Sequence, residues 1–387
     1  MRSSPSKPSF PKIAFIKPYW GIREFFCGTF YRDSEDNNFV ETLTEKFRNK
    51  LNIKGTIIPT SSGRTAFELA LKVLKNEYPK RDKVVIPTYG CKGTFDPVIK
   101  AGLKPVLVDI GEDLNITSST VKDYLNTEVL ALLIPHLSGC KAEIESLAKM
   151  AKEKGIIVIE DVCQSLGGRD SKGFWGTQYY MAIFSFGMGK NLMATSGGML
   201  VSNILEKEIL EESKNLGNEN TGTVKKRFEN VVWKYFLKKD IEFESRNIIS
   251  SYKYNKMHPL DARLLSIQLD RLETVLQKRR NNAEKVIKAL KQTGLKFHLQ
   301  CDKNNVYTKL SLIFENADEC SKLKSSFHKM GIEPEEMYTP LHLKNAGIKS
   351  CCPYSEKVYK NIFNIPIRPN LKNKELNMIF KAILNAT

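Results

Sequence analysis

The sequence IIVIEDVCQSLGG (residues 156–168), followed by AIFSFGMGKNLMATSGGML (residues 182–200), predicts the architecture of this chain. Each stretch opens with a short, nearly continuous apolar run, which is typical of a strand buried on both faces of a parallel sheet. An acid, Asp161, ends the first run, and a lysine, Lys190, follows the second. Because the carboxyl ends of the strands line the ligand crevice in open α/β sheets, we expect Asp161 and Lys190 to face one pocket.

The same alternation extends through residues 39–245. Further β-branched runs begin at Val84, Pro105 and Val129. Between them lie stretches with helical spacing of apolar residues, such as TAFELALKVLK and AEIESLAKMAKEK, and another occupies residues 39–51. Strands that alternate with helices predict a mostly parallel sheet that is covered by helices on both faces. We therefore expect a large α/β domain over residues 39–245.

The two ends of the chain are expected to differ from this domain. Residues 1–38 form a predicted N-terminal arm, whose aromatic cluster PYWGIREFF is too irregular to indicate a helix. The basic stretch GNENTGTVKKRFENVVWKYFLKKD (residues 217–240) indicates a boundary or an inserted lid. One long helix over residues 259–290, followed by a mixed pattern of strands and helices, predicts a smaller α+β domain over residues 246–387.

Length and composition exclude several classes of protein. The 387 residues are 41% hydrophobic and 27% charged, which is ordinary for a globular protein and too long for one small module. No apolar run approaches the ~20 residues that cross a bilayer, and the polar N-terminus does not resemble a secretion signal, so we expect a cytoplasmic protein. The eight cysteines show no metal-ligand spacing, so we expect no metal site.

The formal net charge of +17 says less about function. A positive field attracts phosphate-bearing ligands, nucleic acid or an anionic membrane. A generally lysine-rich proteome explains the same charge equally well, so charge alone does not identify a partner.

A candidate phosphate site precedes a helix in TSSGRTAFELALKVL (residues 60–74). Ser62, Gly63 and Arg64 stand where the free backbone amides and the dipole of the helix attract an anion. A plain serine N-cap explains this segment equally well when it is considered alone. Together with the acid and the lysine, however, the turn supplies what pyridoxal phosphate needs. Those needs are a phosphate anchor, a carboxylate that keeps the ring nitrogen protonated, and an amine that holds the aldehyde.

The order and spacing of several motifs resemble the DegT/DnrJ/EryC1/StrS family of sugar aminotransferases. These motifs are IEDVCQSLGG, FSFGMGKN with SGGMLVSN, PTYGCKGTF, IPHLSG, TPLH and NIPIRP. The resemblance covers the chain from about Pro11 to its end, and it implies the fold type I architecture of pyridoxal-phosphate enzymes. That architecture combines a three-layer αβα large domain with a smaller α+β C-terminal domain.

The resemblance also implies roles for individual residues. Asp161 would pair with the pyridine nitrogen of the cofactor, and Gln164 would contact the side of the ring that carries the 3-hydroxyl. Ser185 would hold the phosphate together with the amides of Gly63 and Arg64. The family often has SGTAA at this turn, so the guanidinium of Arg64 is an addition that would reach the phosphate or brace a dimer.

By the same resemblance Lys190 would form the internal aldimine. Family members that dehydrate sugars carry histidine at this position, so lysine implies transamination from an amino-acid donor, commonly glutamate, to a keto sugar that is usually nucleotide-linked. Lys190 would act as general acid and base, and the enzyme would be a homodimer with shared active sites. His136 in IPHLSG and His342 in TPLH could line the site, but a lone histidine after an apolar strand is more often structural.

Several positions depart from the family pattern. Cys91 stands where an aromatic residue usually stacks on the cofactor, and Tyr89 is the nearby substitute. Tyr179–Tyr180 replaces an expected Gly-Asp pair, and Ser196 replaces an acid. The asparagine that the neighbouring subunit usually supplies to the phosphate would be Asn255, in YKYNKM. These departures leave open which sugar is used and which carbon is aminated.

Two alternatives remain open at this point. An inactive family member could serve as a regulatory or nucleic-acid-binding protein through the basic residues 225–239, although the intact lysine and acid count against nucleic acid as the partner. The enzyme could instead contact a membrane surface through aromatic residues that stand among lysines, namely Trp233, Tyr235 and Phe236.

Overall fold

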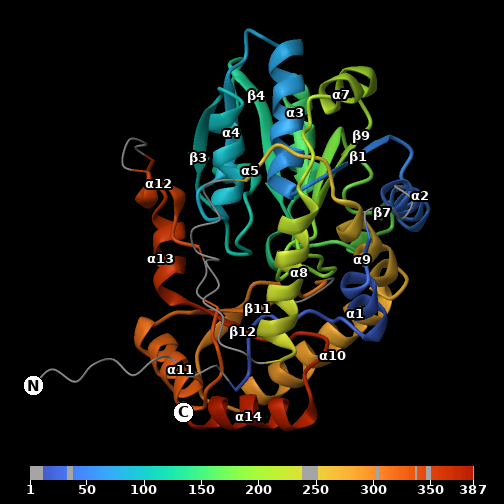
Figure 1. The fold of residues 1–387 in the computed structure, drawn as a ribbon. Coiled ribbons are helices and arrows are strands. Elements are labelled where there is room, and N and C mark those ends of the chain that lie inside the picture. The colour runs from blue at the N-terminus through green and yellow to red at the C-terminus, as the bar shows by residue number, and fades with distance from the viewer. Residues whose placement is uncertain are drawn as a thin grey trace, which may run out of the picture.

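The structure is a computed structural model that describes residues 12–32, 38–237, 252–301, 305–335, 338–345 and 350–386. Its main feature is a seven-stranded sheet in the order β1-β9-β8-β5-β4-β2-β3 (Figure 1). β9 runs antiparallel to both of its neighbours, and the other adjacent strands pair in parallel. The strands are β1 (Thr56–Thr60), β2 (Lys83–Pro87), β3 (Lys104–Val108), β4 (Val129–Pro135), β5 (Ile157–Asp161), β8 (Met181–Ser185) and β9 (Gly198–Ser202).

Helices cover this sheet on both faces, which confirms the expected three-layer α/β architecture. On one face pack α3 (Gly63–Glu77), α4 (Asp96–Lys100) and α7 (Glu206–Ser213). On the other pack α2 (Phe39–Leu51), α5 (Ser118–Val121), α6 (Ile144–Glu153) and α9 (Pro259–Leu269). Every residue of β4 and β5 is buried as a result. That burial explains why these strands appear in the sequence as continuous apolar runs.

A second, smaller sheet forms the C-terminal α+β unit. Its strands pair antiparallel in the order β10 (Phe297–Leu299), β11 (Leu310–Phe314) and β12 (Ile362–Ile365). A shared core joins them to α10 (Leu272–Leu290), α11 (Ala317–Lys329) and α14 (Asn373–Leu384), while α12 (Leu341–Lys344) and α13 (Pro353–Asn361) lie between α11 and β12 in the chain. The predicted boundary at residues 245 and 246 lies outside the described residues.

The structure corrects two expectations about helices. The predicted irregular arm contains a helix, α1 (Ile22–Thr29), beside α9 at the edge of the molecule (Figure 1). The single helix predicted over residues 259–290 is two helices, because α9 ends at Leu269 and α10 begins at Leu272. Both leucines are buried, so the apolar spacing continues through the turn and hides it. The basic stretch, which was expected to be a boundary or an inserted lid, forms α8 (Thr221–Tyr235) as far as it is described.

Candidate active site

Asp161 and Ser185 end adjacent parallel strands of the large sheet. Asp161 is the last residue of β5 and Ser185 the last of β8, and Asp161 pairs with Ile183 in the ladder between them. The Asp161 side chain accepts a hydrogen bond from the backbone N–H of Cys163 across 2.9 Å. This bond fixes the carboxylate at the carboxyl edge of the sheet, where ligands bind in open α/β folds.

The predicted phosphate turn lies directly beside Ser185. Ser62 caps α3, and its hydroxyl accepts a hydrogen bond from the N–H of Thr65 at 3.1 Å. A Cβ added to Gly63 would stand 3.0 Å from the Cβ of Ser185 and 3.1 Å from the sulfur of Cys163. Only glycine fits this approach without a shift, so the first amides of α3 and the Ser185 hydroxyl share one cradle. Such a cradle suits an anion.

Lys190 lies on the loop that follows β8. Its backbone N–H donates to the carbonyl of Gly187 at 3.3 Å, and Gly189 has a positive φ of 88°. Within the described part of the chain, no group accepts a hydrogen bond from the Lys190 ammonium. Burial, reinforced by the charge of Asp161, raises the pKa of the Cys163 thiol well above its usual value, and the charge of Lys190 opposes that rise. Acid, lysine and phosphate turn therefore meet around Cys163.

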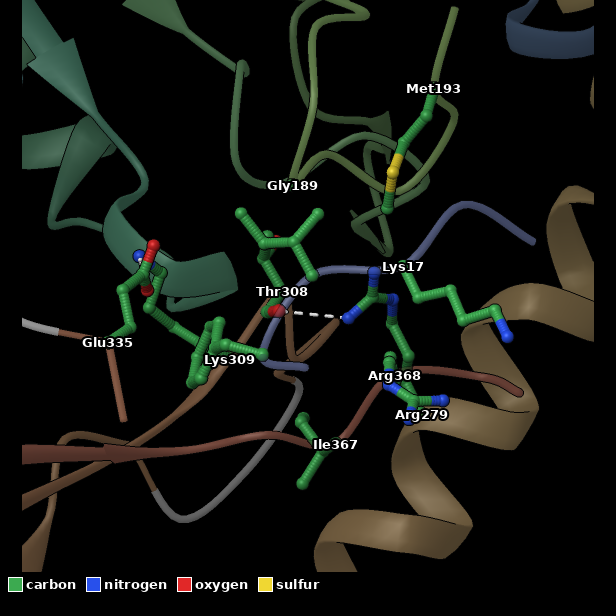
Figure 2. A pocket seen from close by; sticks show the side chains of 11 residues that line it. Lys17, Gly189, Met193, Arg279, Thr308, Lys309, Glu335, Ile367 and Arg368 are labelled. Atoms are coloured by element: carbon green, nitrogen blue, oxygen red, sulfur yellow. Dashed lines mark hydrogen bonds and ion pairs between the residues drawn. The ribbon is translucent and has the colours of Figure 1, made fainter. Parts of the chain in front are cut away.

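A buried arginine ties the Lys190 loop to the smaller sheet. Arg279 of α10 donates to the carbonyl of Thr308 at 2.8 Å and to that of Lys190 at 3.5 Å. Figure 2 shows this guanidinium directed at Thr308, below Gly189 in the view, with Arg368 close by. Burial, and then the charge of Arg368, lower the pKa of Arg279 to about 10, so it stays charged at neutral pH. The lysine is thus held where the two sheets meet.

Gln164 is held at both ends of its side-chain amide. Its oxygen accepts from the N–H of Ser138 at 3.1 Å, and its nitrogen donates to the hydroxyl of Tyr338 at 2.9 Å. Burial raises the pKa of Tyr338 well above its usual value, so its phenol is neutral. Sequence reasoning missed Tyr338, although it lies two residues before the TPLH motif's proline.

Cys91, at the position where the family usually stacks an aromatic residue, and Tyr89, its expected substitute, differ in exposure. Tyr89 is fully buried, and its ring meets that of Tyr338 edge to face with 6.1 Å between centroids. Its hydroxyl has no hydrogen-bond partner in the described residues. Cys91 is exposed and accepts a hydrogen bond from the N–H of Gly93 at 3.3 Å.

The side chain of Arg64 packs against Gly93, and its guanidinium stacks 4.8 Å from the centroid of the Tyr252 ring.

Asn255 lies beside the phosphate turn of its own chain. Its carbonyl accepts from the N–H of Ser61 at 2.8 Å, and its side-chain oxygen faces Gly217. The role expected for this side chain at a partner's phosphate stays a prediction. Ser196 also serves this turn, because its hydroxyl donates to the carbonyl of Ser61. Tyr179–Tyr180 packs partly buried against the core over β4 and α6.

The two histidines are held in structural contacts. His136 is fully buried between Glu160, 2.8 Å from its Nε2, and the N–H of Ala142, 3.0 Å from its Nδ1. His342 lies between the hydroxyl of Thr88 at 2.7 Å and Glu356 at 3.1 Å.

Among the described residues no group of three potential ligands could hold a metal ion. None of the described helices is long and apolar enough to span a bilayer.

These residues fit pyridoxal phosphate by their chemistry. The cradle at Gly63 and Ser185 offers donors for a phosphate, and the carboxylate of Asp161 matches a protonated ring nitrogen. Gln164 presents an amide on the same edge of the sheet, and Lys190 supplies the amine.

Comparisons with known proteins agree with this site. The sequence matches the model of the DegT/DnrJ/EryC1/StrS aminotransferase family over residues 34–384. A GDP-perosamine synthase from Vibrio cholerae is 24% identical over 362 residues, which cover 91% of this chain and 92% of the relative. Helicobacter pylori PseC, an aminotransferase of pseudoaminic acid biosynthesis, superimposes with a TM-score of 0.80 at 18% identity, covering 97% of this chain and 98% of that one.

A second solved structure was determined with the cofactor. It is the GDP-4-keto-6-deoxy-D-mannose-3-dehydratase of Escherichia coli with bound hydrated pyridoxal phosphate, and it superimposes with a TM-score of 0.77 at 20% identity, over 97% of this chain and 100% of that one. The expected fold is confirmed by these likenesses, and the cofactor is pyridoxal phosphate. The chain belongs to the DegT/DnrJ/EryC1/StrS aminotransferase family.

Proposed function

We propose that this protein transfers an amino group from glutamate to a keto sugar that is linked to a nucleotide. The observation that carries the proposal is the meeting of Lys190, Asp161 and the Gly63 turn at one edge of the large sheet. Relatives that act on GDP-linked sugars support the substrate class. The net charge of +17 suits a substrate that carries a diphosphate.

Each residue of the site has a separate task in this reaction. When bound, pyridoxal phosphate supplies an electron sink for the carbon that gains or loses the amino group. Asp161, whose carboxylate is held in place by the Cys163 amide, would keep the proton on the ring nitrogen. The Lys190 amine would remove a proton from one carbon and return it at the next. The Gly63 turn and Ser185 would anchor the phosphate, which keeps the cofactor in place relative to Asp161 and Lys190.

Lysine at position 190 favours transamination over dehydration. The dehydratase from Escherichia coli shares the fold, so the fold does not separate the two reactions. In the family pattern the dehydrating members carry histidine at this position, whereas this chain carries a lysine whose carbonyl is bound by Arg279. A primary amine can bind the cofactor and later move a proton, and both tasks are needed for repeated amino transfer.

The proposal includes a cytoplasmic homodimer with shared active sites, working in the biosynthesis of an amino sugar for a polysaccharide. The family pattern supports the dimer, since the asparagine at the position of Asn255 usually serves the phosphate of the neighbouring subunit. A regulatory or nucleic-acid-binding role is not favoured, because the residues of the active site are intact. Val224, Phe228, Val231 and Val232 also bury one face of α8 in the core.

Absorption spectroscopy tests the proposal. The purified protein is expected to carry a visible band that shifts when glutamate is added, and borohydride is expected to fix the cofactor on Lys190 as found by peptide mass spectrometry. The exposed Lys172 gives a matched control, because Lys172→Ala should keep the band while Lys190→Ala cannot be labelled by borohydride. A protein that stays colourless with added pyridoxal phosphate would refute the proposal. Transfer of nitrogen-15 from glutamate to GDP-, UDP- or dTDP-linked keto sugars then identifies the acceptor.

A further inference from the structure

A stripe of large apolar side chains lies on the outer face of α1. Phe25 and Phe26 lie three and four residues after Ile22, so the three share one face of the helix, and Phe30 extends the stripe as the C-cap residue just after it. Their exposed fractions are 71%, 43%, 51% and 63%. A surface helix ordinarily turns such a stripe toward the core. In α1 the opposite face is buried, and the apolar face is presented to the outside.

The buried face of α1 holds the helix in this orientation. Glu24 is fully buried, pairs with Arg271, and accepts a hydrogen bond from the N–H of Gly21 at 2.9 Å. Gly28 lies so close to α8 that a Cβ there would stand 2.2 Å from the ring of Phe228. The helix could turn its stripe inward only by breaking the ion pair and this close packing. The exposure of the stripe is therefore built into the fold.

The apolar surface continues from α1 onto its neighbours. Ile22 and Phe25 line a groove with Phe236 at the end of α8. On the other side of the helix, Phe26 and Phe30 line a groove whose far wall is formed by α2 and α9. We name this surface, made of the α1 stripe and Phe236, the aromatic face. Of the aromatic residues expected at a membrane, Phe236 belongs to it, whereas Tyr235 is partly buried against the core.

Cations stand around the aromatic face. Arg23 is exposed between residues of the stripe. Lys17 lies 5.6 Å from the centroid of the Phe236 ring, and Arg263 lies 4.9 Å from that of Phe39. The acid of α1, Glu24, is buried against Arg271 and adds no negative charge to the surface. Aromatic rings edged by Lys and Arg are the composition of protein segments that lie in the headgroup region of a bilayer.

We propose that the aromatic face docks this protein on an anionic lipid surface. The rings would enter the headgroup region and the surrounding cations would meet the lipid phosphates. The charge of the surface favours a lipid membrane over a second copy of this chain as the partner. A two-fold contact brings a patch against itself, so the cations of one aromatic face would be brought among those of the second copy, and like charges across an interface are unfavourable. Docking at a surface needs no spanning helix, and it is independent of the amino transfer.

Vesicle flotation of the full chain, loaded with pyridoxal phosphate, tests the proposal. The vesicles are phosphatidylcholine alone or with about 30% phosphatidylserine, at about 0.1 M salt. Wild type is expected to float with the anionic vesicles only. Ile22→Ser with Phe26→Ser should weaken partitioning by about tenfold or more, because two large apolar contacts are lost. The matched control is Ile99→Ser with Leu210→Ser, which removes side chains of similar exposure, 51% and 50%, from α4 and α7.

Both double variants should retain the wild-type rate of amino transfer, which separates this test from that of the proposed function. Arg23→Glu should weaken flotation and reduce its dependence on salt. Three results would overturn the proposal. One is a wild type that does not float with anionic vesicles at low salt, and another is a control that loses as much binding as the α1 variant. The third is a light-scattering measurement in which the α1 variant dissociates a dimer that wild type forms.

Discussion

The side-chain amide of Gln164 donates a hydrogen bond to the hydroxyl of Tyr338 across 2.9 Å and joins segments that are 174 residues apart. Gln164 follows β5 of the large sheet, whereas Tyr338 precedes α12 in the C-terminal part of the chain. Thr308 strengthens the same junction, because its hydroxyl donates to the carbonyl of Gln164. The C-terminal unit therefore positions Gln164, the residue of the large domain for which we propose a contact with the cofactor.

Tyr338→Phe tests this link. Loss of the hydrogen bond should lower kcat/KM about fivefold, since a net hydrogen bond contributes about 1 kcal/mol. Burial raises the pKa of Tyr338, so its phenol keeps its proton between about pH 6 and 9 and the pH profile should keep its shape. Steady-state kinetics across pH provide the measurement. Tyr359→Phe, at an exposed site on α13, is the control. Equal kcat/KM in the two variants would mean that the hydrogen bond between Gln164 and Tyr338 does not contribute to catalysis.

Gly63→Ala should weaken cofactor binding. The added methyl would stand 3.0 Å from the Ser185 Cβ and 3.2 Å from the carbonyl of Phe184, and neither atom can move without displacing β8. The amides of α3 would then shift from the phosphate, and the Kd for pyridoxal phosphate should rise about tenfold. Fluorescence titration measures this Kd. Gly294→Ala, whose added methyl meets no atom within 4 Å, should bind pyridoxal phosphate as wild type does. An unchanged Kd in both variants would contradict the proposal that the Gly63 turn holds the phosphate.

Asp161→Asn should lower kcat about 10²–10³-fold, because a neutral amide does not hold a proton on the ring nitrogen as a carboxylate does. Its oxygen still accepts from the Cys163 N–H, so thermal unfolding of the cofactor-free protein should change little. Rates and melting temperatures are compared with those of Asp123→Asn at an exposed position. A variant within tenfold of wild type would remove Asp161 from the mechanism.

The parts of the fold that the sequence predicts are those in which burial leaves a pattern. β4 and β5 are covered on both faces, so their apolar runs are continuous. β1, with five residues and a proline, carries too little pattern to be identified. The helix α1 was missed because it has only eight residues, so its apolar spacing repeats too few times within the aromatic cluster to indicate a helix.

The sequence likewise indicated only part of the candidate site. Asp161 and Lys190 follow strands, so local motifs place them at one edge of the sheet. Tyr338 and Arg279 reach the site from the C-terminal unit by long-range packing. The TPLH motif adjoins Tyr338 but does not indicate its contact with Gln164, and Arg279 belongs to none of the motifs. The stacking role predicted for Tyr89 stays a prediction, because it depends on how the cofactor lies, and so does the contact of Cys91 with the cofactor.

Asp261 should make the stability of the folded protein depend on pH. It is 1% exposed, and its carboxylate accepts from the N–H and hydroxyl of Thr195 at 2.9 and 2.8 Å. Burial raises its pKa to about 6 although Arg227 lies 3.8 Å away and opposes the rise. The folded chain therefore holds this proton more tightly than the unfolded chain, whose value is about 3.9. The free energy of unfolding should fall as pH rises from about 4 through 6 and level off above about 7.

Asp261→Asn should remove this slope. The difference in unfolding free energy between wild type and variant should change by roughly 2–3 kcal/mol between about pH 4.5 and 7.5, at about 1.4 kcal/mol per unit of pKa. Asparagine keeps an oxygen for the Thr195 N–H, so the loop after Lys190 should stay bound to α9 and the variant should fold. Urea denaturation at a series of pH values measures the difference, with Asp123→Asn as the control that keeps the wild-type slope. Parallel curves for wild type and Asp261→Asn would show that the buried carboxylate has the same proton affinity folded and unfolded.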